Sequence, residues 1–322
     1  MTRFRNALPQ LSGDLFLTDA GLETDLIFNH VIEIREFAAH TLLPDPTGRA
    51  AIERYFEGFL GLARETNAGF ILDTVTWKAH RHWASALGET PGELRAANHD
   101  SVALAAVLRD RTNNPQPVVL NAVIGPRGDA YRPERKIGAD EAERYYAEQL
   151  EWLAETDADM VTGLTFNQAS EATGLVRAAR TAGMPVAISF TTETDGRLPD
   201  GQPLRDAIEQ VDSETNNETS YYMVNCAHPD HFAEALAGDW AQRIRGIRAN
   251  ASRLSHAQLD EATEIDAGDP HELGALYADL ARRLPWLNVF GACCGGDLRH
   301  VTQIAGAVKG PAKVSPLPAQ VA

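Results

Sequence analysis

Short apolar segments alternate with longer amphipathic segments from one end of the chain to the other. Regular alternation of this kind is typical of a parallel sheet covered by helices. Eight runs rich in β-favouring residues, each bounded by Gly, Asp or Pro, predict strands at residues 15–18, 70–73, 117–124, 160–162, 185–190, 221–224, 244–247 and 286–290. Intervening segments with helical periodicity predict helices at residues 50–66, 92–110, 140–156, 171–182, 230–237, 270–284 and 298–308.

The number of predicted strands decides between two α/β architectures. Eight strand–helix units favour a closed (β/α)8 TIM barrel that spans residues 1–322 as a single domain. An open doubly wound sheet would show similar alternation, but the Gly-x-Gly-x-x-Gly fingerprint is absent after the first predicted strand. Asp140 is predicted as a helix N-cap, Gly183 as a helix stop and residues 212–220 as a polar connection. The proline-containing tail at residues 310–322 is predicted to be irregular.

The charge of the chain excludes several classes of partner. It has 45 acidic against 29 basic residues, a formal net charge of -16, which argues against binding to nucleic acid or to anionic membrane surfaces. No apolar run approaches the roughly 20 residues of a membrane helix, and the N-terminus lacks the apolar core of a signal peptide. A cytoplasmic location is therefore the default expectation. The sequence does not decide between a monomer and a homo-oligomer.

The cysteines carry the clearest chemical signal in the chain. There are three, an odd number and too few for a disulfide scaffold: Cys226, Cys293 and Cys294. They follow the sixth and eighth predicted strands, and the C-terminal strand ends of a barrel meet at one face, where barrel active sites form. Three converging thiolates leave a fourth position of a tetrahedral Zn²⁺ open, as catalytic zinc sites do. The glycines at 291, 295 and 296 permit the tight turn that adjacent ligands need.

Two other interpretations of the cysteines stay open at this point. Free cysteines are often simply small buried hydrophobic residues. Alternatively, Cys293 and Cys294 form a reversible vicinal disulfide with Cys226 as the attacking thiol, which would make the protein a redox enzyme or sensor. The usual Cys-x-x-Cys spacing of such proteins is missing here.

Motifs around these cysteines resemble the zinc-dependent homocysteine S-methyltransferase family. The resemblance begins with Asn225-Cys226, followed by Pro229, and with the glycine-rich Cys293-Cys294 segment. Further matches cover roughly residues 14 to 308 in family order, namely Asp19 to Leu26, Ala68 to Ala79, Ile124-Gly-Pro126, Glu171-Ala172, Ile188-Ser-Phe190 and Asp200-Gly201. The resemblance implies a barrel in which zinc, held by Cys226, Cys293 and Cys294, binds the thiol of homocysteine. The bound thiolate would take a methyl group from an onium donor such as an S-methylmethionine-like sulfonium or betaine, or from a cobalamin-linked donor, and give methionine.

Departures from the family pattern bear on the acceptor. The family has a glutamate at the end of the fourth strand that holds the substrate ammonium, and this chain has Leu164 there, followed by Thr165. Glu23 stands where the family has a small residue, close to Asp19 and Thr24 in the first-strand loop. Asp19 and Glu23 are therefore expected to face the cationic group of the substrate together, with Thr24 beside them. If they do not, the acceptor is a thiol other than homocysteine.

Other candidate residues surround the methyl donor and the metal. Thr76 and Trp77 fall where the resemblance places the donor side of the site, and an indole face attracts a sulfonium or quaternary ammonium. Packing between barrel and helix is the alternative role for Trp77. Asn225 is expected to orient Cys226 or to ligate zinc weakly. The competing functions are the vicinal-dithiol redox protein and a barrel that binds zinc or a metabolite without turnover.

Overall fold

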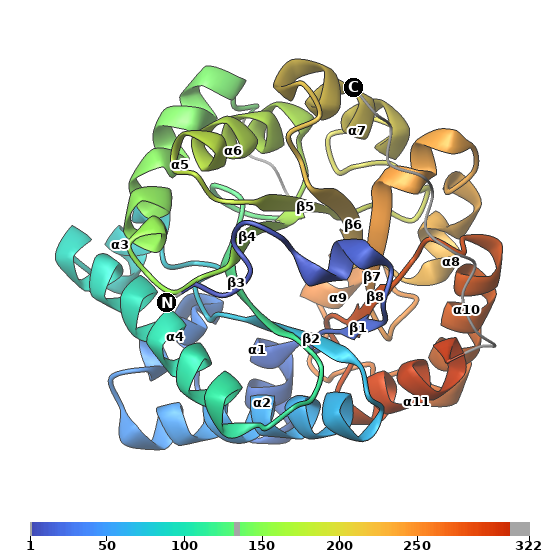
Figure 1. The fold of residues 1–322 in the computed structure, drawn as a ribbon, viewed down its shortest axis with the longest axis horizontal. Coiled ribbons are helices and arrows are strands. Elements are labelled where there is room, and N and C mark those ends of the chain that lie inside the picture. The colour runs from blue at the N-terminus through green and yellow to red at the C-terminus, as the bar shows by residue number, and fades with distance from the viewer. Residues whose placement is uncertain (1, 132–135, 310–322) are drawn as a thin grey trace.

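Eight parallel strands close into a barrel in strict sequence order, and β1 pairs with β8 to complete the ring. The computed structural model describes residues 2–131 and 136–309. Figure 1 shows the ring of strands surrounded by helices, which confirms the predicted (β/α)8 TIM barrel. The strands are β1 (Phe16–Leu17), β2 (Gly69–Asp73), β3 (Val118–Ile124), β4 (Met160–Phe166), β5 (Val186–Phe190), β6 (Tyr221–Asn225), β7 (Ile244–Ala249) and β8 (Val289–Ala292).

The helices cover the outside of the barrel and bury their apolar faces against the strands. They are α1 (Leu22–Thr24), α2 (Pro46–Glu65), α3 (Arg81–Leu87), α4 (Pro91–Arg111), α5 (Ala139–Ala154), α6 (Ala169–Thr181), α7 (Leu204–Thr215), α8 (Pro229–Phe232), α9 (His256–Asp260), α10 (Pro270–Arg283) and α11 (Leu298–Val308). Single turns of other helix types lie at Pro9–Ser12, Asp25–Asn29, Arg35–Phe37, Ala39–Leu42, Ala233–Ala235 and Asp239–Arg243.

Local sequence signals explain several helix boundaries. Thr90 and Glu93 form a reciprocal capping box at the start of α4. Gly183, with φ of 67°, lies just beyond the end of α6, as predicted for a helix stop. The prediction for Asp140 is wrong, because α5 begins one residue earlier and Gly138 is its N-cap. Asp140 instead lies in the first turn, where its charge still favours the helix dipole.

One helix of the ring is missing from the sequence-based prediction. α7 occupies Leu204–Thr215, and the polar connection expected from residue 212 starts only after its last turn. Asp212 is buried, and its carboxylate accepts a hydrogen bond from Tyr222 at 2.9 Å and pairs with Arg243 at 2.7 Å. These partners come from β6 and from the turn before β7, so local sequence does not reveal that the polar residue faces inward. The predicted helix at 230–237 is also shorter, since α8 gives way to a 3-10 turn after Phe232.

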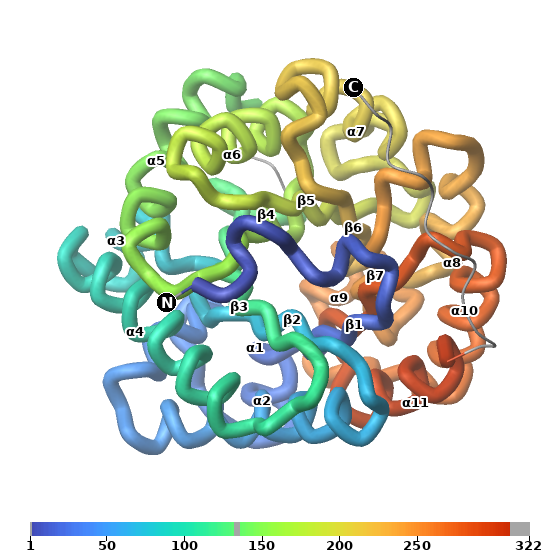
Figure 2. The backbone as a smooth tube through the Cα atoms, in the orientation of Figure 1, coloured from blue at the N-terminus to red at the C-terminus, as the bar shows by residue number. Residues whose placement is uncertain are grey.

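The N-terminal segment closes one end of the barrel. Figure 2 shows this blue segment crossing the ring of strands, and Leu8 packs into an inner cluster with Phe16, Met160 and Tyr221. The guanidinium of Arg5 anchors the segment by donating hydrogen bonds to backbone carbonyls at the end of α5 and in the turn that follows it. Access to the barrel is therefore left at the opposite end, where the strands finish. The tail predicted to be irregular, residues 310–322, lies outside the described residues.

Candidate metal centre and active site

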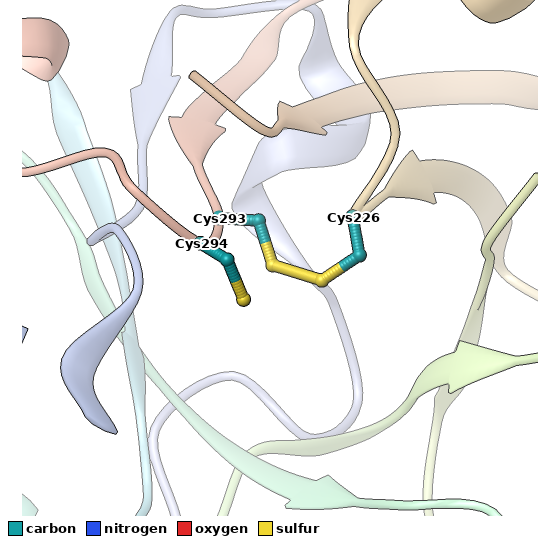
Figure 3. A group of neighbouring side chains, drawn as sticks. All are labelled: Cys226, Cys293 and Cys294. Atoms are coloured by element: carbon teal, nitrogen blue, oxygen red, sulfur yellow. A yellow bond between two sulfur atoms is a disulfide. The ribbon is translucent and has the colours of Figure 1, made fainter. Parts of the chain in front are cut away.

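Three cysteine sulfurs meet at the C-terminal end of the barrel. Cys226 directly follows β6, and Cys293 and Cys294 directly follow β8. Figure 3 shows the side chains converging from these two strand ends, and their sulfur atoms all lie within 4.8 Å of one another. Cys226 and Cys293 are buried and Cys294 is partly exposed. Among the described residues, these three cysteines form the group of side chains that could hold a metal ion.

The structure joins Cys226 to Cys293 in a disulfide and leaves the thiol of Cys294 free (Figure 3). The bond links two strand ends 67 residues apart, and the adjacent pair of the vicinal-disulfide hypothesis is not joined. Burial, reinforced by the nearby Glu23 carboxylate, raises the pKa of the Cys294 thiol to about 11. Once the disulfide is reduced, the cluster presents three sulfur ligands to one point in space and is able to bind a metal ion.

Two glycines let the segment that follows β1 approach the cysteine segment closely. A side chain at Gly291 would overlap Thr18 and would lie 2.6 Å from the backbone oxygen of Asp19. At Gly21, a Cβ would lie 2.8 Å from the backbone oxygen of Cys293. Real Cβ atoms do not approach other atoms so closely, so these positions require glycine for space and not for a turn.

Asn225 lies beneath the cysteines and is fully buried. Its Oδ1 accepts hydrogen bonds from the Thr165 amide at 3.1 Å and from the Ser189 hydroxyl at 2.6 Å. Its Nδ2 donates to the Thr165 hydroxyl at 2.8 Å and faces the sulfur of Cys293 at 3.9 Å. The amide thus fixes the end of β4 relative to β6 and orients a polar N–H towards the sulfur cluster.

A cavity of about 680 Å³ opens above the cysteines. Aromatic side chains and carboxylates make up much of its wall. The aromatic residues are Phe28, Phe37, Phe56, Trp77, Trp83 and Tyr131, and the acidic residues are Asp19, Glu23, Glu36, Asp73, Asp129, Asp260, Glu264 and Asp266. Lys78, Arg248 and His256 are the basic or titratable-nitrogen side chains in the same lining. The cavity is therefore a largely apolar chamber whose wall carries an excess of negative charge.

Arg248, at the end of β7, is buried between two carboxylates. Its Nη2 donates to Asp19 at 2.6 Å, and its Nη1 pairs with Asp73. Its Nε donates to the backbone oxygen of Ala292, the residue before Cys293, at 3.3 Å. Burial raises the pKa of Asp19 to about 7, and the negative charge of Asp73 adds to this rise, while Arg248 and the hydrogen bond from Tyr55 oppose it. Arg248 was not among the predicted site residues, because β7 contains two arginines, Arg245 and Arg248, and local sequence does not indicate which of them is buried.

Comparison with known proteins agrees with the cysteine geometry. The family model for homocysteine S-methyltransferases matches residues 16–308. The chain belongs to the homocysteine S-methyltransferase family. Homocysteine S-methyltransferase YbgG of Bacillus subtilis (strain 168) is 27% identical over 253 residues, which cover 72% of this chain and 77% of that protein.

Solved structures support the fold of this family member. The oxidized form of the homocysteine methyltransferase MmuM from Escherichia coli superposes with a TM-score of 0.73 at 18% identity, covering 94% of this chain and 99% of that chain. The metallated form of the same protein gives a TM-score of 0.69 at 18% identity, covering 91% and 96%. This chain is thus an enzyme of the homocysteine S-methyltransferase family on the TIM-barrel fold.

The residues predicted to bind substrate in this family member differ in whether they line the cavity. The segment after β1 contributes Asp19, Glu23 and Thr24 to the cavity wall. The Thr24 hydroxyl already donates a hydrogen bond to the backbone oxygen of Gly21 at 2.9 Å. Burial raises the pKa of Glu23. Thr76 is fully buried and donates to the Val123 backbone at 2.7 Å, so it does not line the cavity.

Trp77 lines the cavity and is hydrogen-bonded to Leu164, the residue that stands where a glutamate was expected. Its indole Nε1 donates to the backbone oxygen of Leu164 at 2.9 Å, and the Leu164 side chain lines the cavity as well. The ammonium of Lys78 lies 3.7 Å from the ring centre of Trp83 and 5.6 Å from that of Trp77. These rings therefore already attract a positive charge within the protein.

Tyr131 is a second residue near the cysteines that was not among the predicted site residues. Its hydroxyl is hydrogen-bonded to the side chain of Cys294, and its ring lies 4.4 Å from that of His256. His256 is held in turn by the backbone oxygen of Thr192 at 3.1 Å. Tyr131 follows the predicted third strand by seven residues, in a loop where spacing alone does not indicate which side chain reaches the metal centre.

No helix among residues 2–131 and 136–309 is long and apolar enough to cross a membrane.

Proposed function

We propose that this family member is a zinc-dependent S-methyltransferase that moves a methyl group from an onium donor to a small thiol, with homocysteine as the first acceptor to test. The observation that carries the proposal is the meeting of Cys226, Cys293 and Cys294 at the floor of a cavity. YbgG, a relative at 27% identity, is a homocysteine S-methyltransferase by name, and a metallated form of MmuM is known.

The donor set suits zinc. In a tetrahedral site with Zn–S bonds of about 2.3 Å, sulfur atoms lie about 3.8 Å apart. The three sulfurs of this chain already lie within 4.8 Å of one another, so a reduced cluster needs little adjustment to hold the ion. When bound, zinc supplies a deprotonated thiol at neutral pH, since metal coordination lowers the pKa of the ligand.

The transfer itself needs no general base from the chain. The acceptor loses its thiol proton to solvent on binding, and the thiolate sulfur attacks the methyl carbon of the donor. A sulfur–carbon bond forms as the onium heteroatom–carbon bond breaks, and the bonding electron pair goes to that heteroatom. The chain's contribution is to bring the two substrates together in an apolar chamber, where water is displaced and the reacting atoms are held in line.

The wall of the cavity favours a cationic donor. Trp77 and Trp83 already attract the ammonium of Lys78, and a cation over an indole face gains about 2 kcal/mol when it is desolvated. The carboxylates of Glu36 and Asp129 add negative charge to the same wall. A sulfonium or quaternary ammonium compound is therefore the donor class we propose.

The disulfide between Cys226 and Cys293 supports a second candidate function, a thiol–disulfide redox protein. A structure of an oxidized form of the homocysteine methyltransferase MmuM is also known. The two functions differ in what the reduced protein does with a metal. A methyltransferase takes up one zinc ion per chain on reduction, whereas a redox protein cycles between dithiol and disulfide without it.

The test combines metal analysis with a transfer assay. The protein is reduced, supplied with zinc and assayed for methionine formation from homocysteine with S-methylmethionine and with betaine. We expect one zinc per chain and activity that a chelator abolishes. Cys226→Ser is expected to lose both zinc and activity, while Ser213→Ala on the exposed face of α7 keeps both. Activity that persists in Cys226→Ser would contradict the proposal, and a reduced protein that binds no zinc would favour the redox function.

A further inference from the structure

Three of the eight acidic side chains in the cavity wall come from β2 and from the segment that follows β1, and their partners differ. Asp19, Asp73 and Glu23 all line the cavity. Arg248 pairs with the first two through its two terminal nitrogens. Among the described residues, no cationic side chain lies within ion-pair distance of the Glu23 carboxylate, although Lys78 and Arg248 act on it from farther away.

The carboxylate oxygens of Asp19 and Asp73 that do not pair with Arg248 accept hydrogen bonds from other side chains. The second oxygen of Asp19 accepts a hydrogen bond from Tyr55 at 3.2 Å, and the second oxygen of Asp73 accepts one from the Asn121 side chain at 2.6 Å. Each carboxylate oxygen of both acids thus already accepts from a protein donor, and an ammonium ion would have to share these oxygens with those donors. Asp19 and Asp73 are therefore held by the protein itself.

Arg248 also ties this pair of acids to the metal centre. Its backbone oxygen accepts the amide of Cys226 at 3.1 Å, and its Nε donates to the carbonyl of Ala292, directly before Cys293. The side chain thus joins the ends of β1, β2 and β8 to its own strand, β7. A planar guanidinium with five N–H donors can make all of these bonds at once, which lysine cannot do.

Resting on the proposed function, the geometry points to Arg248 as a specificity-determining residue for the acceptor. By pairing with Asp19 and Asp73, Arg248 leaves Glu23 as the carboxylate beside the cysteines that receives the ammonium of the substrate. Leu164, on the β4 side of the cavity, offers no charge for this purpose. The acceptor class is thus an aminothiol whose ammonium is held from the β1 loop and not from the end of β4.

Thiol binding to the cobalt(II)-substituted protein tests this assignment without methyl transfer. Thiolate coordination changes the absorption of cobalt, so each Kd can be measured directly. Three thiols separate the charges: homocysteine, 3-mercaptopropylamine, which lacks the carboxylate, and 4-mercaptobutanoate, which lacks the amine. We expect the wild-type protein to bind 3-mercaptopropylamine about tenfold more tightly than 4-mercaptobutanoate, as one charge-assisted hydrogen bond provides.

Three variants locate the source of that preference. Glu23→Gln is expected to abolish it while the Arg248 pairs stay intact. Arg248→Met is expected to increase the preference for the amine by about tenfold, because Asp19 and Asp73 both become available. The triple variant Arg248→Met/Asp19→Asn/Asp73→Asn, in which neither acid keeps its charge, is expected to return it to the wild-type value. A merely structural role for Arg248 would weaken all three thiols by the same factor.

The outcomes separate this inference from the proposed function. If no thiol changes the cobalt spectrum of the wild-type protein, the proposed function fails. If thiols bind but Glu23→Gln keeps the preference for the amine, the assignment of Arg248 and Glu23 is overturned. A preference unchanged in a folded Arg248→Met protein overturns it as well. Should Arg248→Met not fold, the Glu23→Gln measurement decides alone.

Discussion

Asn225 gives a sharp test of how the barrel end holds its shape. Replacing it with leucine keeps the approximate size of the side chain and removes its polar atoms. The Thr165 amide and the Ser189 hydroxyl then lose their acceptor in a fully buried position. Thr165 also has φ of 65°, which is unfavourable for a β-branched residue and is held in place by the Asn225 side chain.

The size of the effect follows from the two orphaned donors. A buried donor without a partner costs about 1–3 kcal/mol, so two cost about 3 kcal/mol at the lower part of that range. Unfolding entropy of about 2.1 cal/mol/K per residue gives about 0.7 kcal/mol/K for the 322-residue chain. Asn225→Leu is therefore expected to lower the Tm by about 4 °C.

Calorimetry of the reduced protein in the presence of a chelator measures this change without a contribution from metal binding. Ser189→Ala is the matched control, because it removes one hydrogen bond and leaves Asn225 bonded to Thr165. Its Tm is expected to fall by about 1–2 °C. A Tm for Asn225→Leu within about 1 °C of the wild-type value would refute the reasoning.

Three further perturbations test other parts of the site. Burial raises the pKa of Asp19 to about 7, so the folded chain keeps a proton that the unfolded chain has lost. The difference in Tm between the wild-type protein and Asp19→Asn should therefore shift against the wild-type protein as the pH rises from about 4 to 7. A shift in favour of the wild-type protein over that range would contradict this expectation. Gly291→Ala should destabilise the chain by about 1–3 kcal/mol through its clash with Thr18, while Gly306→Ala, which meets nothing within 4 Å, should not. Trp77→Leu should raise the KM of an onium donor about tenfold and leave the acceptor KM unchanged, and equal changes in both would argue for a packing role.

Local patterns were sufficient for most of the fold. Each predicted strand overlaps a strand of the barrel, because buried parallel strands are short continuous apolar runs. α7 was not predicted although Leu204, Ala207, Ile208 and Val211 have helical spacing in the sequence. What the sequence did not reveal is the inward orientation of Asp212, whose partners Tyr222 and Arg243 are brought to it by the fold. The N-cap of α5 was predicted two residues too late, at Asp140, because a glycine, Gly138, occupies that position.

The sequence by itself determined the architecture and the cysteine set. The number of strand–helix units defined the barrel, and the placement of Cys226, Cys293 and Cys294 after two predicted strands was enough to bring them to one face. Parallel strands of a closed barrel all end on the same side, so position along the chain translates directly into position in space.

The tertiary structure alone decided how the surrounding charges are used. Arg248 reaches Asp19 and Asp73 across 229 and 175 positions of sequence, and these pairs determine which carboxylates are already neutralised. It likewise decided that Thr76 turns into the protein while Tyr131 reaches Cys294. Local periodicity predicts where a strand ends, but side-chain pairing depends on which residues the closed barrel brings within a few ångströms, and that depends on the whole chain.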